Sequence, residues 1–157
     1  MAKQIIKGMT MLLLIMAVAF VTAVASANGQ SRHDVAKIPF EFVVGDKSLP
    51  AGQYDVTAMT SNDSVLRITN SEQHQTALRQ TQTITRSERS NNGKLVFRRY
   101  ADRYFLAEVW SAGETSGRQL AKSKQERAIE RELASIPSKG EWAQSGYEIV
   151  EIAAVRH

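Results

Sequence analysis

The sequence predicts a mainly β domain, an antiparallel sandwich or small open barrel of about seven strands with one short helix in the C-terminal half. Three observations support this fold class. Short runs of alternating apolar and polar residues follow one another, separated by turn-forming residues such as Asn92-Gly93. The longest run rich in aromatic and β-branched residues, 94–110, has room for two strands joined by a tight turn at Ala101-Asp102. After Ser123 the apolar residues change to helical spacing.

The first predicted strand starts at Val35. Pro39 has no N–H to donate to a neighbouring strand, so we expect either this strand at an edge of the sheet or Pro39 at a position that faces away from a neighbour. The next segment, 45–52, contains Gly and Pro residues that are typical of a loop. Large apolar residues occupy alternate positions of the strand, which indicates that it is half-buried; they are Ile38, Phe40, Phe42 and Val44.

Three further runs surround the central hairpin. Residues 54–58 and 65–69 alternate, and 76–90 is rich in Thr, Gln and Arg, which favours mostly solvent-facing strands. The second strand of the hairpin has large apolar groups on both faces, so we expect it at the centre of the sheet. A period of two places Phe105, Ala107 and Val109 on one face, and Tyr104, Leu106, Glu108 and Trp110 on the other.

The helix and the last strand are predicted from a change of period. Ser123 and Glu126 fit a capping box, in which the hydroxyl and the carboxylate bind early backbone N–H groups. We expect Pro137 to end the helix. The final run, 147–155, is apolar on both faces, so we expect a strand that lies between two neighbours. The apolar stripe of the helix consists of Ala128, Ile129, Leu133 and Ala134.

The N-terminal segment has the pattern of a secretory signal peptide. Two lysines precede an almost continuously apolar stretch, 9–21, and small residues occupy the positions that a signal peptidase reads in Ala25-Ser26-Ala27. Cleavage between Ala27 and Asn28 divides the chain into a signal peptide, 1–27, and a single domain, 28–157. The alternative is an uncleaved membrane anchor, because Met9–Ala25 is just long enough to span a bilayer.

Composition sets limits on the mature domain. The chain has no cysteine, so an exported form has no disulfide and no thiolate metal ligand. Without Lys3 and Lys7, 18 Lys and Arg residues face 16 Asp and Glu residues. This balance gives no support for nucleic acid or an anionic membrane as a partner. We therefore expect a periplasmic or secreted protein that meets the membrane only through its N-terminal segment before cleavage.

Catalytic and metal-binding motifs do not emerge from the sequence. His33, His74 and His157 are far apart and have no metal-ligand spacing. The segment Gly113–Gly117 lacks the central serine of a nucleophile elbow. We therefore expect no enzyme activity, no metal and no cofactor.

A binding surface is predicted on the central hairpin and the loop that precedes the last strand. Arginines interleaved with aromatic rings resemble a nucleic-acid-binding strand, but Val96 and Arg98 occupy positions where that motif needs small residues, and export argues against nucleic acid. An envelope protein or a glycan is the expected partner. The alternative is that the rings belong to the core and the arginines pair with acids. The predicted surface consists of Arg99, Tyr100, Arg103, Tyr104 and Trp142.

A different function class stays open. Asp102 and Glu108 lie on the same hairpin, and two carboxylates are the usual catalytic groups of a polysaccharide hydrolase. A carboxylate-dependent hydrolase that acts on envelope polymers is therefore the alternative to a non-enzymatic binding or structural module.

Three segments together resemble an uncharacterised group of small exported β-rich bacterial proteins. They are Ile38–Gly45 with Leu49–Tyr54, then Asp102–Trp110, and then Gly117–Arg127. The resemblance covers most of residues 35–134 and implies an exported β-rich domain. It supplies no activity, ligand or catalytic residue. The signal peptide, the pattern of short strands and the lack of a catalytic constellation instead lead us to expect a non-enzymatic binding or structural module of the bacterial cell envelope or periplasm.

Overall fold

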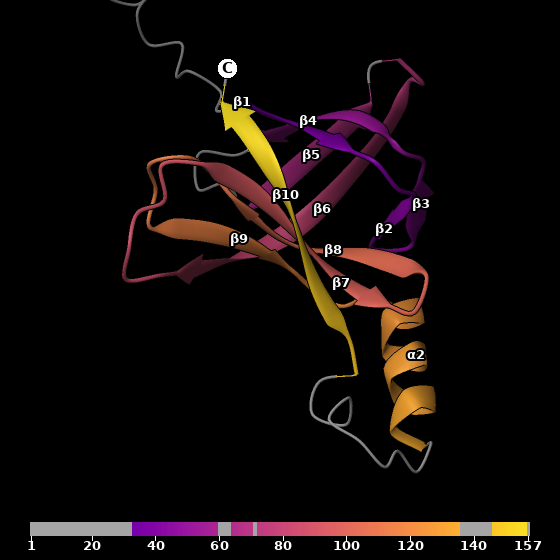
Figure 1. The fold of residues 1–157 in the computed structure, drawn as a ribbon. Helices are drawn as coiled ribbons and strands as arrows, with labels where there is room; N and C mark the ends of the chain where they lie inside the picture. Colours follow the sequence, from indigo (N-terminus) through magenta and orange to yellow (C-terminus); the bar gives the residue numbers. More distant parts are fainter. Residues whose placement is uncertain (1–32, 60–63, 71, 136–145, 157) are drawn as a thin grey trace, which may run out of the picture. The chain divides into compact units, whose positions relative to one another are not determined.

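The structure, a computed structural model, describes residues 33–59, 64–70, 72–135 and 146–156. The predicted signal peptide, its cleavage site, Pro137 and Trp142 lie outside these residues. The described part is mainly β with one helix, as the sequence predicts (Figure 1). Its elements are β1 (His33–Ile38), β2 (Phe42–Val44), β3 (Lys47–Leu49), β4 (Gly52–Ala58), β5 (Val65–Asn70), β6 (Gln75–Thr85), β7 (Gly93–Tyr100), β8 (Arg103–Trp110), β9 (Ser116–Leu120), α2 (Lys124–Ser135) and β10 (Glu148–Arg156).

Eight of the strands close into an antiparallel barrel. Its order is β1, β4, β5, β6, β9, β8, β7 and β10, and β10 pairs again with β1. The last strand therefore lies between two neighbours, as its two apolar faces predict. The sequence predicts a small open barrel or a sandwich but not the closure, which depends on the pairing of the C-terminal part of β8 with β9.

Large side chains fill the inside of the barrel. Phe42, Tyr54 and Phe97 are completely buried, and their rings meet edge to face at centroid distances of 5.0 and 5.4 Å. Leu95 and Ile68 complete the same cluster. A barrel of about eight strands has an interior that side chains can just fill. Burial of each such side chain stabilises the fold by about 1.5–3 kcal/mol.

The predicted first strand is divided in two by Pro39. β1 ends at Ile38, and it pairs with β10 on one side and β4 on the other, so the expectation of an edge position is wrong. Pro39 lies in the break between the strands and withdraws no donor from the barrel. β2 then runs parallel to the start of β8, and the short strand β3 forms the edge of the sheet.

A β-bulge changes the faces of the central hairpin. Phe97 pairs with Leu106 and Val96 pairs with Glu108, so Ala107 is an extra residue in β8. Leu106 and Val109 therefore both belong to the interior cluster, although a strict period of two separates them. The predicted division of this strand into two faces is wrong from the bulge onward.

The turn between β2 and β3 depends on a glycine. Gly45 has a φ of 63°, and a Cβ at this position would lie 2.0 Å from Nε of Arg79. That Nε donates a hydrogen bond to the carbonyl of Val44 at 3.1 Å, so Arg79 ties the turn to β6. A side chain at position 45 would displace this contact.

We expect Gly45→Ala to lower the free energy of unfolding by about 2 kcal/mol, because the left-handed backbone and the guanidinium both oppose a Cβ. Gly113→Ala is the matched control. Gly113 has a φ of 78°, and a Cβ added there would meet no described atom within 4 Å. This substitution therefore introduces the backbone strain alone, and we expect about 1 kcal/mol. Urea unfolding measures both changes, and equal losses would contradict the role of Arg79.

Candidate functional site

Tyr100 does not lie on the surface where the sequence analysis places it. Its side chain is 2% exposed and packs with Val43 and Phe105 on the outer side of β7 and β8, under Ile129 of α2. The expectation that Tyr100 presents an exposed ring is therefore wrong. The alternation of β7 places the Tyr100 side chain outside the barrel interior, and α2 then covers this side chain.

Arg99 and Tyr104 are already engaged within the protein. The ring of Tyr104 is stacked on Phe40 with centroids 3.8 Å apart, and Cζ of Arg99 lies 5.6 Å from its centroid. Arg99 also donates to the carbonyl of Ala101 at 2.7 Å and to Glu148 at 3.1 Å. Tyr104 therefore has little free ring face for a sugar to stack on. Of the predicted surface residues that the structure describes, Arg103 is the exposed cation.

The carboxylates of the alternative hydrolase lie at opposite ends of β8. Asp102 precedes the strand and Glu108 is near its end, so the two are about 20 Å apart at the rise of an extended chain. Carboxyl groups that cleave glycosidic bonds are about 5–9.5 Å apart. Glu108 instead accepts a hydrogen bond from Nε1 of Trp110 at 2.8 Å. These two residues therefore do not form one catalytic pair.

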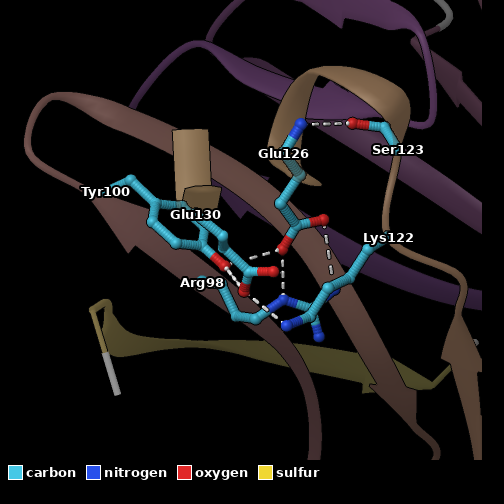
Figure 2. A network of polar contacts seen from close by, with 6 residues as sticks. All are labelled: Arg98, Tyr100, Lys122, Ser123, Glu126 and Glu130. Carbon is cyan, nitrogen blue, oxygen red and sulfur yellow. Dashed lines mark hydrogen bonds and ion pairs between the residues drawn. The ribbon is translucent and has the colours of Figure 1, made fainter. Parts of the chain in front are cut away.

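A network of buried charges joins the start of α2 to β7 (Figure 2). The side chains of Arg98 and Glu126 are 7% and 2% exposed. Nε of Arg98 donates to one carboxylate oxygen of Glu126, and Nη2 donates to the other at 3.3 Å. Burial lowers the pKa of Arg98, but the hydrogen bond with Glu126 and the charges around the guanidinium together outweigh burial and raise the pKa. Arg98 therefore stays charged beneath the helix.

Tyr100 and Glu130 extend the network toward solvent. The hydroxyl of Tyr100 donates to Glu130 at 2.6 Å and lies 3.2 Å from a carboxylate oxygen of Glu126. Burial, together with these carboxylates, raises the pKa of Tyr100 far above its ordinary value. Burial raises the pKa of Glu130, but hydrogen bonds from Lys122 and Tyr100 outweigh this and lower it. The network therefore holds α2 in place through charge-assisted hydrogen bonds.

The capping box is only half formed. The backbone N–H of Glu126 donates to Oγ of Ser123 at 3.0 Å, as predicted. The carboxylate of Glu126 binds Arg98 instead of the first backbone N–H. The apolar stripe contributes Ile129 to the contact with the barrel, whereas Leu133 is 38% exposed. Sequence reasoning missed Glu126 as the buried residue of this helix because a carboxylate without its partner is a surface residue.

A second polar site lies at one mouth of the barrel. Asp34 has the same parity in β1 as Ala36 and Ile38, so it faces inward, and it is 3% exposed. Its Oδ2 accepts a hydrogen bond from Oγ of Ser111. Within the described residues, its Oδ1 accepts no hydrogen bond. An acidic residue on the apolar face of an alternating strand is the sequence signal that could have indicated this site.

Asp34 lines a cavity of about 30 Å³. We call this cavity and its lining the mouth site. The floor is apolar, and it consists of Val56, Ala58, Leu66 and Val109. The walls are polar, and they consist of Asp34, Ser111, Glu114, Ser116 and Arg118.

Arg156 stands at the rim of the mouth site. Its Nη2 is 3.1 Å from Oε1 of Glu114, whereas its Nε is 3.9 Å from Oδ1 of Asp34. The second distance is too long for a hydrogen bond. Arg156 is therefore drawn toward Glu114, and Oδ1 of Asp34 stays buried beside the cavity without a hydrogen bond from a described residue.

The described histidines have no partners for a metal ion. His33 pairs with Asp55 at 2.7 Å on neighbouring strands. In the part of the chain that the structure covers, no three His, Asp or Glu side chains gather closely enough to hold a metal. His157 lies outside the described residues.

Comparisons with known proteins add no family to these observations. No protein-family model, no curated protein and no solved structure matches the chain. Among the helices that the structure describes, none has the length and apolar character of a membrane span. The function therefore has to be argued from the residues of the sites themselves.

The buried ion pair gives the first prediction from this region. We expect Glu126→Ala to lower the free energy of unfolding by about 3–5 kcal/mol, because it leaves the Arg98 guanidinium buried without its partner. Glu132→Ala on the exposed face of the same helix is the control, and we expect a change within about 0.5 kcal/mol. Thermal or urea unfolding measures both. A similar small change for both variants would show that α2 does not depend on the ion pair.

The lowered pKa of Glu130 predicts a dependence of stability on pH. Its ordinary value is 4.5, and the folded value is lower, so the folded state binds the proton less readily than the unfolded state. The stabilising contribution is therefore full above the ordinary pKa and is lost as the pH falls through the folded pKa. We expect Glu130→Gln to lower stability at neutral pH and to flatten the acid side of the stability curve. An unchanged slope below about pH 5 would contradict this assignment.

Proposed function

We propose that the protein is an exported, non-enzymatic binding module of the bacterial cell envelope or periplasm, and that it binds its ligand at the mouth site. The observation that carries this proposal is Oδ1 of Asp34, which is buried beside the cavity and accepts no hydrogen bond from a described residue. A buried carboxylate oxygen without a hydrogen bond costs free energy, and an incoming donor removes that cost. Such an oxygen beside a cavity is therefore a natural point of attachment for a ligand.

The filled interior supports a site at the mouth over a site inside the barrel. Pockets that enclose whole small molecules have volumes of about 300–1,000 Å³. The cavity of about 30 Å³ admits one terminal group of a ligand, and the remainder stays outside. This favours a module that recognises the end of a molecule over a carrier that encloses one.

The arrangement of charges supports binding over catalysis. Asp34 is held by Ser111 and lies near Arg156, and Glu114 is held by Arg156. Groups that are fixed in this way suit the recognition of a ligand. The separation of Asp102 and Glu108 along β8 removes the specific residues on which the alternative hydrolase rests.

Binding at the mouth site can be tested by NMR spectroscopy of the ¹⁵N-labelled protein with a panel of amino acids, amines, simple sugars and muramyl peptides. We expect at least one class to shift the amide signals of Val109, Ser111 and Ser116, and Asp34→Asn to remove the shifts. Asp102→Asn, at the other end of β8, is the matched control and should leave them unchanged. Shifts confined to other residues, or none with any class, would overturn the proposed site.

Export can be tested by the mass of the native protein. We expect the soluble periplasmic or secreted fraction to contain a chain that begins at Asn28. A full-length chain in the membrane fraction would show that the segment Met9–Ala25 is retained as an anchor. Mass spectrometry of fractionated cells distinguishes these outcomes.

A further inference from the structure

We propose that the ligand group at the mouth site is a primary ammonium group. This inference rests on the proposed function and adds the chemical class of the ligand. Three features carry it: the unsatisfied carboxylate oxygen of Asp34, the size of the cavity and the position of Arg156.

Asp34 and Glu114 supply two carboxylates to the lining, and Arg118 supplies one guanidinium. Arg156 at the rim pairs with Glu114, so Oδ1 of Asp34 is the carboxylate oxygen of the site that accepts no hydrogen bond among the described residues. Nη1 of Arg118 donates to Oγ1 of Thr83, which directs this cation toward β6. The unsatisfied oxygen of Asp34 is an anionic acceptor. It therefore favours a group that donates hydrogen bonds and carries positive charge, and it disfavours an anion.

The size of the cavity selects among cations. A cavity needs about 10–15 Å³ to hold one water, so a cavity of about 30 Å³ has room for a small terminal group. An ammonium group and the carbon atom that bears it are such a group, whereas a whole sugar needs a larger pocket. The apolar floor formed by Val56, Leu66 and Val109 suits the methylene group next to the nitrogen.

Arg156 predicts the sign of a mutational effect. Its guanidinium lies 3.9 Å from Oδ1 of Asp34, where it repels a bound cation. Removal of this charge should therefore strengthen the binding of an ammonium ion. For an anionic ligand the opposite holds, because Arg156 would then be its partner. The two variants Asp34→Asn and Arg156→Gln thus distinguish a cationic from an anionic ligand without knowledge of the natural molecule.

The experiment measures the affinity of n-butylammonium, n-butanol and butyrate for the full protein by NMR titration. We expect binding of n-butylammonium alone, weakened at least about tenfold by Asp34→Asn and strengthened about threefold by Arg156→Gln. Asp102→Asn should have no effect. Thermal melts show whether each variant is folded. If Asp34→Asn is unfolded, the direction in which Arg156→Gln changes the affinity for n-butylammonium tests the inference.

Each other outcome overturns the inference. Equal binding of n-butanol would identify a neutral hydroxyl group as the ligand. Binding of butyrate that Arg156→Gln abolishes would identify an anion. Binding of none of the three probes would show that the cavity takes no alkyl-bearing head group. The proposed function survives these results where another class in the NMR panel shifts the mouth signals, and it fails where none does.

Two sources of a primary ammonium group can be separated with two further probes. 1,4-Diaminobutane represents a free polyamine, and Nα-acetyl-lysine N-methylamide represents a lysine side chain on a peptide. Tighter binding of the first would support a small diffusible amine. Tighter binding of the second would support the side chain of an envelope peptide or protein.

Discussion

The closure of eight strands around a filled interior is the constraint on which the rest of the structure depends. Because Phe42, Tyr54 and Phe97 occupy the interior, they leave no room among them for a ligand. The filling ends at the layer of Asp34, where short hydroxyl side chains leave the small cavity. A ligand of the kind proposed would therefore have to bind at the ends or on the outer side of the barrel.

The outer side of the barrel uses charge where apolar contact would be expected. α2 offers the barrel one large apolar side chain, Ile129, and a buried carboxylate, Glu126. Replacement of a buried ion pair by apolar residues is often neutral or stabilising, so Arg98 and Glu126 are weak evidence for stability as such. Their hydrogen-bond geometry instead fixes one position of the helix along β7, since a shift by one residue would bury two unpaired charges.

The sequence predicts the fold class because alternation, turn residues and the change of period are local signals. Prediction from the sequence fails where the pairing or burial of a residue depends on residues that are distant in the chain. Pro39 indicates a strand boundary or an edge equally well, and only the pairing of β1 on both sides distinguishes them. The extra residue Ala107 is invisible without its partner strand. The burial of Tyr100 and the buried role of Glu126 are both missed for the same reason. Glu126 is buried against Tyr100 and Arg98, which are distant from it in sequence. The mouth site is formed by residues from five strands and a loop. Its only signal in the sequence is that Asp34 falls on the face of β1 that points into the barrel.

The position of β10 has a consequence for the order in which the chain can fold. Both β1, near the start of the domain, and β7 remain unpaired along one edge until Glu148–Arg156 is available. A chain that lacks these residues cannot close its barrel, so both edges stay open until β10 adds to them. The position of β10 in the sequence therefore determines when the barrel can close during folding.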